Sequence, residues 1–155
     1  MRASPDVSGT LRYAEPRSSI ASVFTIEQIE DLHGRLGRAE TLADYVRSLA
    51  EIGVVRYDSY VSDGHSEYFG HDGHRVISQP VHGRLSVAAD SDRNAFLDHL
   101  RRHERGETSY MEMSRGLADS GVERWTVDTH AMTMTFHDQS GEILLAEHIT
   151  PTDAS

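Results

Sequence analysis

The chain has 155 residues, a length that fits one domain or two small repeats sharing one hydrophobic core. Its formal charge of −10 argues against a nucleic-acid-binding surface, because binding to phosphates needs concentrated Lys and Arg. The absence of cysteine excludes disulfides, thiolate catalysis and zinc sites with cysteine ligands. The sequence contains no apolar run of membrane-spanning length and no recognisable signal peptide, so we expect a soluble, cytoplasmic protein that binds neither membranes nor nucleic acid.

The two ends of the chain differ in composition from its middle. Residues 1–22 are polar and contain two prolines, and we expect a flexible tail there. A single α+β domain is predicted over residues 23–150, and residues 151–155 are expected to be frayed.

The first half of this domain reads as two helices followed by three strands. Thr25 and Gln28 have the spacing of a capping box, and Gly53 stands where a helix commonly ends. Asp63-Gly64 indicates a tight turn between strands. The predicted helices and strands cover, in chain order, residues 25–36, 41–52, 54–61, 66–69 and 74–79.

The second half repeats this plan after a connection over residues 80–92, in which Leu85 and Val87 suggest one more short strand. Ser91 or Asp92 is expected to cap a helix, and Ser109 with Glu112 to open the next one. The three strands of this half are predicted over residues 122–129, 132–137 and 142–150.

The two halves also resemble each other residue by residue. Residues 47–57 and 115–125 share Arg, Leu, Ala, Gly, Val and Arg at matching positions, and Gly53 and Gly121 are 68 positions apart. We therefore predict an internally duplicated α-α-β-β-β unit, with repeats over about residues 25–79 and 91–149. Short connections favour an antiparallel sheet covered by helices on one face, with a pseudo-two-fold axis relating the halves.

Several stretches resemble the YbcV-like family of small bacterial proteins of unknown function, sometimes labelled phage envelope protein. The most specific stretch is Gly-Val-Glu-Arg-Trp-Thr-Val-Asp, ending at Asp128. The resemblance extends roughly over residues 25–149. It implies no established activity and supports the fold prediction. Met134 and His137 stand where Cys and Tyr are commoner in the family. The other matching segments are residues 106–110 and 132–138, with Gly141 and Glu147.

The C-terminal hairpin carries the candidate proton carrier. If residues 138–141 form a four-residue loop, Met134 faces Leu145 and Met132 faces Glu147 across the strands. A carboxylate on this apolar face would be partly desolvated and suited to general acid or base chemistry. The alternative is that Glu147 lies at the end of the sheet and reaches solvent or pairs with an arginine.

Aromatic residues suggest where a ligand would bind. Tyr57 and Trp125 occupy equivalent positions in the two halves and could wall a pocket for a planar ligand, although core packing is the commoner role of such residues. Arg56 and Arg124 are expected on the opposite face of the sheet, where they could bind an anionic group or, as the favoured alternative, pair with the nearby Asp58 and Asp128. The full set of candidate ligand-binding residues is Trp125, Tyr57, Tyr68, Tyr110, Met132 and Met134.

The ten histidines include one pair, His99 and His103, at the i, i+4 spacing of zinc-binding helices. The glutamate that accompanies such pairs in metalloproteases is missing, and no three histidines have a recognised ligand spacing. We therefore predict no metal site and no cofactor.

Two functions remain open. The first is a binding or interaction module that uses a groove between the repeats for a small ligand or a peptide. The second is a cofactor-independent acid–base enzyme, an isomerase, lyase or cyclase, with Glu147, Asp128 and His148 around a pocket walled by Trp125 and Tyr57. A homodimer formed through an unpaired sheet edge is compatible with either function.

Overall fold

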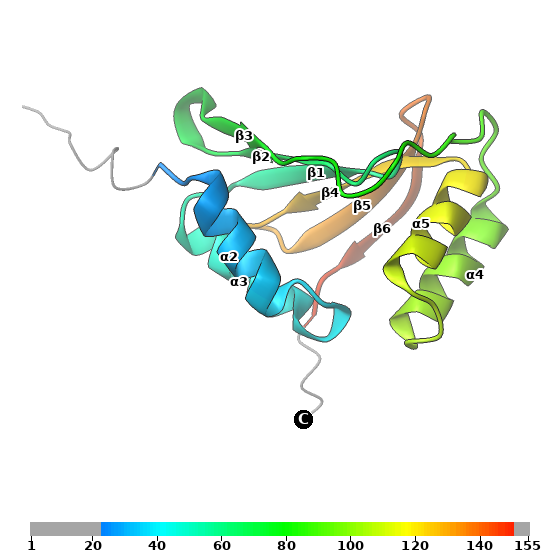
Figure 1. Ribbon diagram of the computed structural model, residues 1–155, viewed down its shortest axis with the longest axis horizontal. Coiled ribbons are helices and arrows are strands. Elements are labelled where there is room, and N and C mark those ends of the chain that lie inside the picture. The colour runs from blue at the N-terminus through cyan, green and yellow to red at the C-terminus, as the bar shows by residue number, and fades with distance from the viewer. Residues whose placement is uncertain (1–22, 151–155) are drawn as a thin grey trace, which may run out of the picture.

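The computed structural model describes residues 23–150; the tails predicted at residues 1–22 and 151–155 lie outside the described residues. Four α-helices and a six-stranded antiparallel sheet make up an α+β fold in this region (Figure 1). None of the helices between residues 23 and 150 is long and apolar enough to cross a membrane.

The elements follow the predicted order. The helices are α2 (Ile26–Leu36), α3 (Leu42–Glu51), α4 (Arg93–Glu104) and α5 (Tyr110–Asp119), with short 3-10 helices η1 (Ala39–Thr41) and η2 (His71–Gly73). The strands are β1 (Arg56–Tyr60), β2 (Ser66–Phe69), β3 (Arg75–Ile77), β4 (Val122–Asp128), β5 (Thr133–Asp138) and β6 (Ile143–His148).

Side-chain caps determine where three of the helices begin. Thr25 with Gln28 at α2, and Ser109 with Glu112 at α5, form the two predicted capping boxes. Asp92, rather than Ser91, caps α4 by accepting a hydrogen bond from the backbone N–H of Ala95. These bonds satisfy N–H groups that have no partner inside the helix.

Helix α3, predicted to start at Thr41, begins without a side-chain cap. The Thr41 hydroxyl does not cap α3 but donates a 2.6 Å hydrogen bond to the carbonyl of Leu36, the last residue of α2. Thr41 therefore closes the connection between α2 and α3.

The strands lie in the order β3-β2-β1-β4-β5-β6, and β1 and β4 form the centre of the sheet. The register places two rows of side chains on one face, because side chains of directly paired residues point the same way. One row is Val76, Tyr68, Tyr57, Val127, Met134 and Glu147, and the next is Ser66, Ser59, Trp125, Phe136 and Leu145.

The helices cover this face of the sheet in two pairs. In Figure 1, α2 and α3 lie below one end of the sheet and α4 and α5 lie below the other. The first pair packs on an N-terminal cluster of buried residues that includes Tyr57, Tyr68 and Val127. The second packs on a C-terminal cluster that includes Val122 and Phe136. Trp125 and Met134 contact both clusters.

The C-terminal hairpin corrects one prediction. Met134 faces Glu147 and not Leu145, which instead faces Phe136. The register shifts between Phe136 and His137, as in a β-bulge, so the strands are offset by two residues from a simple four-residue loop. Met132 has a φ of 57° and lies in the turn before β5 rather than in the strand.

The strand suggested at Leu85 and Val87 is wrong. Residues 80–92 contain no assigned strand, and both side chains pack against the C-terminal cluster from an irregular segment. Backbone hydrogen bonds from Val81 to the carbonyl of Asp63 (2.8 Å) and from Leu85 to that of Ser62 (2.6 Å) hold this segment against the β1–β2 turn.

Candidate functional site

Between the two buried clusters, the helix-covered face of the sheet carries a diagonal row of side chains that we call the strip. It crosses the sheet from the β2 side to the β6 side and consists of Ser66, Ser59, Trp125, Met134 and Glu147. Two of its members pack on both clusters, so the strip lies where the halves of the core meet.

The centre of the strip is apolar and not fully covered. Trp125 and Met134 are both partly exposed, whereas their neighbours Val127 and Phe136 are buried. The Trp125 indole packs against the Phe136 ring with 5.9 Å between ring centroids and 45° between ring planes. The indole packs on both clusters, and part of its surface stays exposed.

Hydroxyl groups form the β2 end of the strip. The Ser59 and Ser66 hydroxyl oxygens are 2.6 Å apart and both residues are buried. The Ser66 backbone N–H donates to the Ser78 hydroxyl at 2.8 Å. Buried hydroxyls need such partners, and the hydroxyl protons can rotate to donate or to accept.

Tyr57 and Tyr68, both predicted to bind a ligand, lie beside these serines but belong to the core. Their exposed fractions are 4% and 5%, and their ring centroids are 5.2 Å apart. The Tyr68 hydroxyl is 3.3 Å from that of Tyr45 on α3. Burial raises the pKa of all three phenols, so they stay protonated and serve as hydrogen-bonding groups.

Glu147 occupies the β6 end of the strip. Its side chain is 34% exposed, and one carboxylate oxygen lies 3.6 Å from the Arg101 guanidinium on α4. Arg101 makes a shorter contact, 3.0 Å, with Glu104. This arrangement matches the alternative in which Glu147 pairs with an arginine, and it leaves two carboxylates sharing one guanidinium.

The other two predicted catalytic residues lie on the opposite face of the sheet. Asp128 accepts hydrogen bonds from the backbone N–H groups of His130 (2.9 Å) and Ala131 (2.8 Å) and so closes the β4–β5 turn. His148 is exposed and faces Thr133. Because the side chains of Glu147 and its chain neighbour His148 point to opposite faces, the structure does not bring the three residues together.

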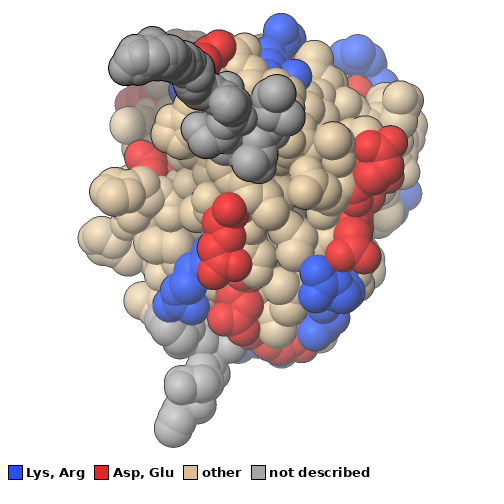
Figure 2. All heavy atoms as spheres, turned by 90° about the vertical axis from the view of Figure 1, so that its left-hand side faces the viewer, with Lys and Arg blue, Asp and Glu red and all other residues tan. Residues whose placement is uncertain are grey.

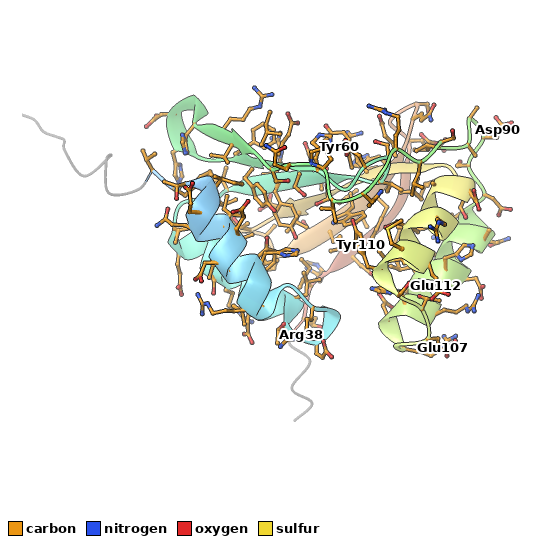
Figure 3. The ribbon with its side chains drawn as sticks, in the orientation of Figure 1. Arg38, Tyr60, Asp90, Glu107, Tyr110 and Glu112 are labelled. Carbon is orange, nitrogen blue, oxygen red and sulfur yellow. The ribbon has the colours of Figure 1, made fainter. Side chains whose placement is uncertain are left out.

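The remaining predicted ligand-binding residues lie away from the centre of the strip. Met132, in the β4–β5 turn, packs against the N-terminal cluster. Tyr110, at the start of α5, is 39% exposed and approaches Gly64 in the β1–β2 turn. Figure 3 shows Tyr110 on the helix side of the sheet and Tyr60 on the other side.

The helix-free face is polar. As predicted, Arg56 lies there beside an aspartate, with its guanidinium 3.8 Å from Asp58, and it also packs over the Phe69 ring. Arg124 lies on the same face, but its guanidinium pairs with Glu123 at 3.5 Å rather than with Asp128. The Thr126 hydroxyl donates to Asp58 at 2.6 Å. These contacts satisfy the charged groups within the sheet itself.

His99 and His103, the pair at the i, i+4 spacing, each pack against a neighbouring segment. The His99 ring lies against Gly116 on α5, and the ring of His103 is 3.1 Å from the carbonyl of Thr108. Over residues 23–150, no group of three or more His, Asp or Glu side chains is placed to hold a metal ion.

Sequence reasoning missed three residues of this region. Ser59 and Ser66 were overlooked although strand alternation, with Tyr57 and Val61 on the same face, could have placed Ser59 there. Arg101 carries no such signal, because its contact with Glu147 joins a helix to a strand far along the chain.

The surface charge has no dominant sign on the side seen in Figure 2. Acidic and basic side chains lie next to each other on that side of the molecule. Exposed ion pairs on α2 and α3 include Asp31–Arg35 and Asp44–Arg47.

A family model described as "Protein of unknown function (DUF1398)" matches residues 30–148. The match covers all the strands and almost all of the four α-helices, so it includes the whole strip. A comparison with curated proteins found no match.

Proposed function

The chain belongs to the DUF1398 family of proteins of unknown function, and we propose that it is a binding module for a small planar organic molecule. The ligand would lie on the strip, with its ring system on Trp125 and Met134. The narrower resemblance to YbcV-like proteins remains a prediction that rests mainly on residues 118–128.

One observation carries this proposal: Trp125 and Met134 pack against both core clusters and still keep part of their surface exposed. Side chains held from both sides lose little further freedom when a ligand covers them, which lowers the entropic cost of binding. Covering apolar surface stabilises a complex by about 25 cal/mol per Å², and flat rings gain additional contact with an indole.

A duplicated architecture, which we also propose, would place the strip across the junction of two repeats. Tyr57 pairs with Tyr68, and the residues 68 positions later, Trp125 and Phe136, pair with each other in the same way. At the centre, Asp58 pairs with Thr126, which is its own counterpart at that offset. This register supports a pseudo-two-fold axis between β1 and β4.

The acid–base enzyme is the less supported alternative. Of its three proposed proton carriers, Glu147 is on the strip, while Asp128 and His148 are on the other face. A homodimer through a sheet edge stays a prediction, and β3 and β6 are the strands at the two edges.

The test uses Trp125, the single tryptophan of the sequence, as a local reporter. Planar metabolites are screened by thermal shift, since a ligand at 100 times its dissociation constant should stabilise the fold by about 2.7 kcal/mol. Each hit is then titrated against Trp125 fluorescence. We expect stabilising compounds to change this fluorescence, because they would contact the indole.

Two variants test whether the Trp125 side chain contacts the ligand. Trp125→Phe should weaken binding measured by calorimetry, whereas Thr135→Ala, on the helix-free face of β5, should leave it unchanged. Hits that leave Trp125 fluorescence unaltered and bind Trp125→Phe with wild-type affinity would contradict the proposal.

A further inference from the structure

The charges at the β6 end of the strip are unbalanced. Arg101 faces two carboxylates, Glu104 at 3.0 Å and Glu147 at 3.6 Å. One guanidinium and two carboxylates leave one net negative charge beside the apolar centre of the strip. The chain as a whole is also acidic, with a formal charge of −10.

Of the two carboxylates, Glu147 is the one that belongs to the strip. It lies on the same face as Met134, its direct partner across the strands. Arg101 contacts Glu104 more closely, and the two residues are three positions apart on the same helix. The carboxylate of Glu147 therefore keeps capacity to pair with a positive group on a ligand.

The spacing suits a molecule of a few fused rings. Trp125 on β4 and Glu147 on β6 are two strand spacings apart across the sheet and two residues apart along it, so their backbones are about 12 Å apart. A flat ring system on Trp125 and Met134 would bring a group at its edge towards Glu147.

From this arrangement, and resting on the proposed function, we propose that the ligand is a flat organic cation. Its rings lie on the Trp125 indole and the Met134 thioether, and its positive charge pairs with Glu147. An indole face attracts cations through its quadrupole, which adds to the attraction of the carboxylate. An anionic ligand of the same shape would be repelled by Glu147.

The experiment compares three tricyclic probes of similar shape: 9-aminoacridine, which is cationic at neutral pH, uncharged acridone, and anionic acridine-9-carboxylate. Calorimetry measures their affinities, and Trp125 fluorescence reports whether they reach the strip. We expect the cation to bind about 5- to 10-fold more tightly than acridone, and the anion to bind most weakly.

Glu147→Gln should remove the preference for the cation and leave acridone binding unchanged. Glu51→Gln, which neutralises an exposed carboxylate on α3, should change none of the affinities. Arg101→Gln should keep or strengthen binding of the cation, because it frees Glu147 from its partner.

The outcomes separate the two proposals. The charge preference is overturned, and the binding module stands, in either of two cases. In the first, all three probes change Trp125 fluorescence and bind with equal affinity. In the second, Glu147→Gln weakens the binding of acridone as much as that of the cation. If none of the probes changes Trp125 fluorescence and the metabolite screen also finds no ligand, both proposals are overturned.

Discussion

At the scale of single residues, close packing between helices depends on positions where a side chain is absent. Gly116 lies inside α5, and a Cβ added there would come within 2.4 Å of Nδ1 and 2.5 Å of Cγ of His99 on α4. At Gly34, inside α2, nothing apart from its chain neighbours and the local helix backbone lies within 4 Å of the equivalent point. The same substitution should therefore have opposite effects at these two glycines.

Gly116→Ala should destabilise the protein by about 1–3 kcal/mol, because the His99 ring must move out of a packed interface. Gly34→Ala should stabilise it by about 0.5–1 kcal/mol, since alanine loses less conformational entropy in a helix. Urea unfolding of the two variants measures both effects. Equal stability of Gly116→Ala and the wild type would show that His99 moves at no cost.

At the scale of elements, the β5–β6 turn depends on the carboxylate of Asp138. One of its oxygens accepts hydrogen bonds from the Ser140 hydroxyl (2.7 Å), the Ser140 N–H (3.0 Å) and the Glu142 N–H (3.0 Å). The hydrogen bond from the Ser140 hydroxyl is the main reason why the pKa of Asp138 lies below its ordinary value of 3.8. The turn that begins β6, and with it the position of Glu147, is thus held by an ionised group.

The lowered pKa has a direct consequence for stability. A carboxyl group whose pKa is lower in the folded state binds fewer protons there than in the unfolded state. Its contribution to the free energy of unfolding is therefore fully present at neutral pH and is lost as the pH falls through the folded-state pKa. Asp138→Asn should be less stable than the wild type at pH 7. The difference in free energy of unfolding between the variant and the wild type should shrink at about pH 3, where the wild-type carboxyl is increasingly protonated.

Urea unfolding of both proteins at the two pH values tests this expectation. Asp119→Asn, at the exposed C-terminal end of α5, serves as the control for a lost surface charge. A difference for Asp138→Asn that does not depend on pH would contradict the role of the ionised carboxylate.

At the scale of the whole molecule, the core consists of two clusters joined through the strip. Trp125 and Met134 pack on both, and β1 and β4 pair along their length between them. Loss of one cluster would expose apolar surface of the other, so the domain should unfold in a single cooperative transition.

Two probes can check this cooperativity. Trp125 fluorescence reports on the junction, and far-UV circular dichroism reports on the four helices at both ends of the sheet. We expect the two urea transitions to coincide. Separate midpoints would mean that the clusters unfold independently and that the strip is not a rigid platform.

Much of the fold could be predicted from local patterns. The order of helices and strands, the capping residues Thr25, Asp92 and Ser109, and the antiparallel arrangement all follow from hydrogen-bonding and periodicity rules that act within a few residues. Trp125 and Met134 were also identified as candidate ligand-binding residues from their place in the pattern.

The composition of the candidate site depended on contacts between distant segments. The bulge after Phe136 decided that Glu147 faces Met134, and strand alternation then placed Asp128 and His148 on the other face. Arg101 reaches Glu147 because α4 packs over the sheet. Local sequence determined the elements of this protein because caps and periodicity are short-range. The charge and lining of the strip were decided by the tertiary structure, because register and helix packing depend on residues far apart in the chain.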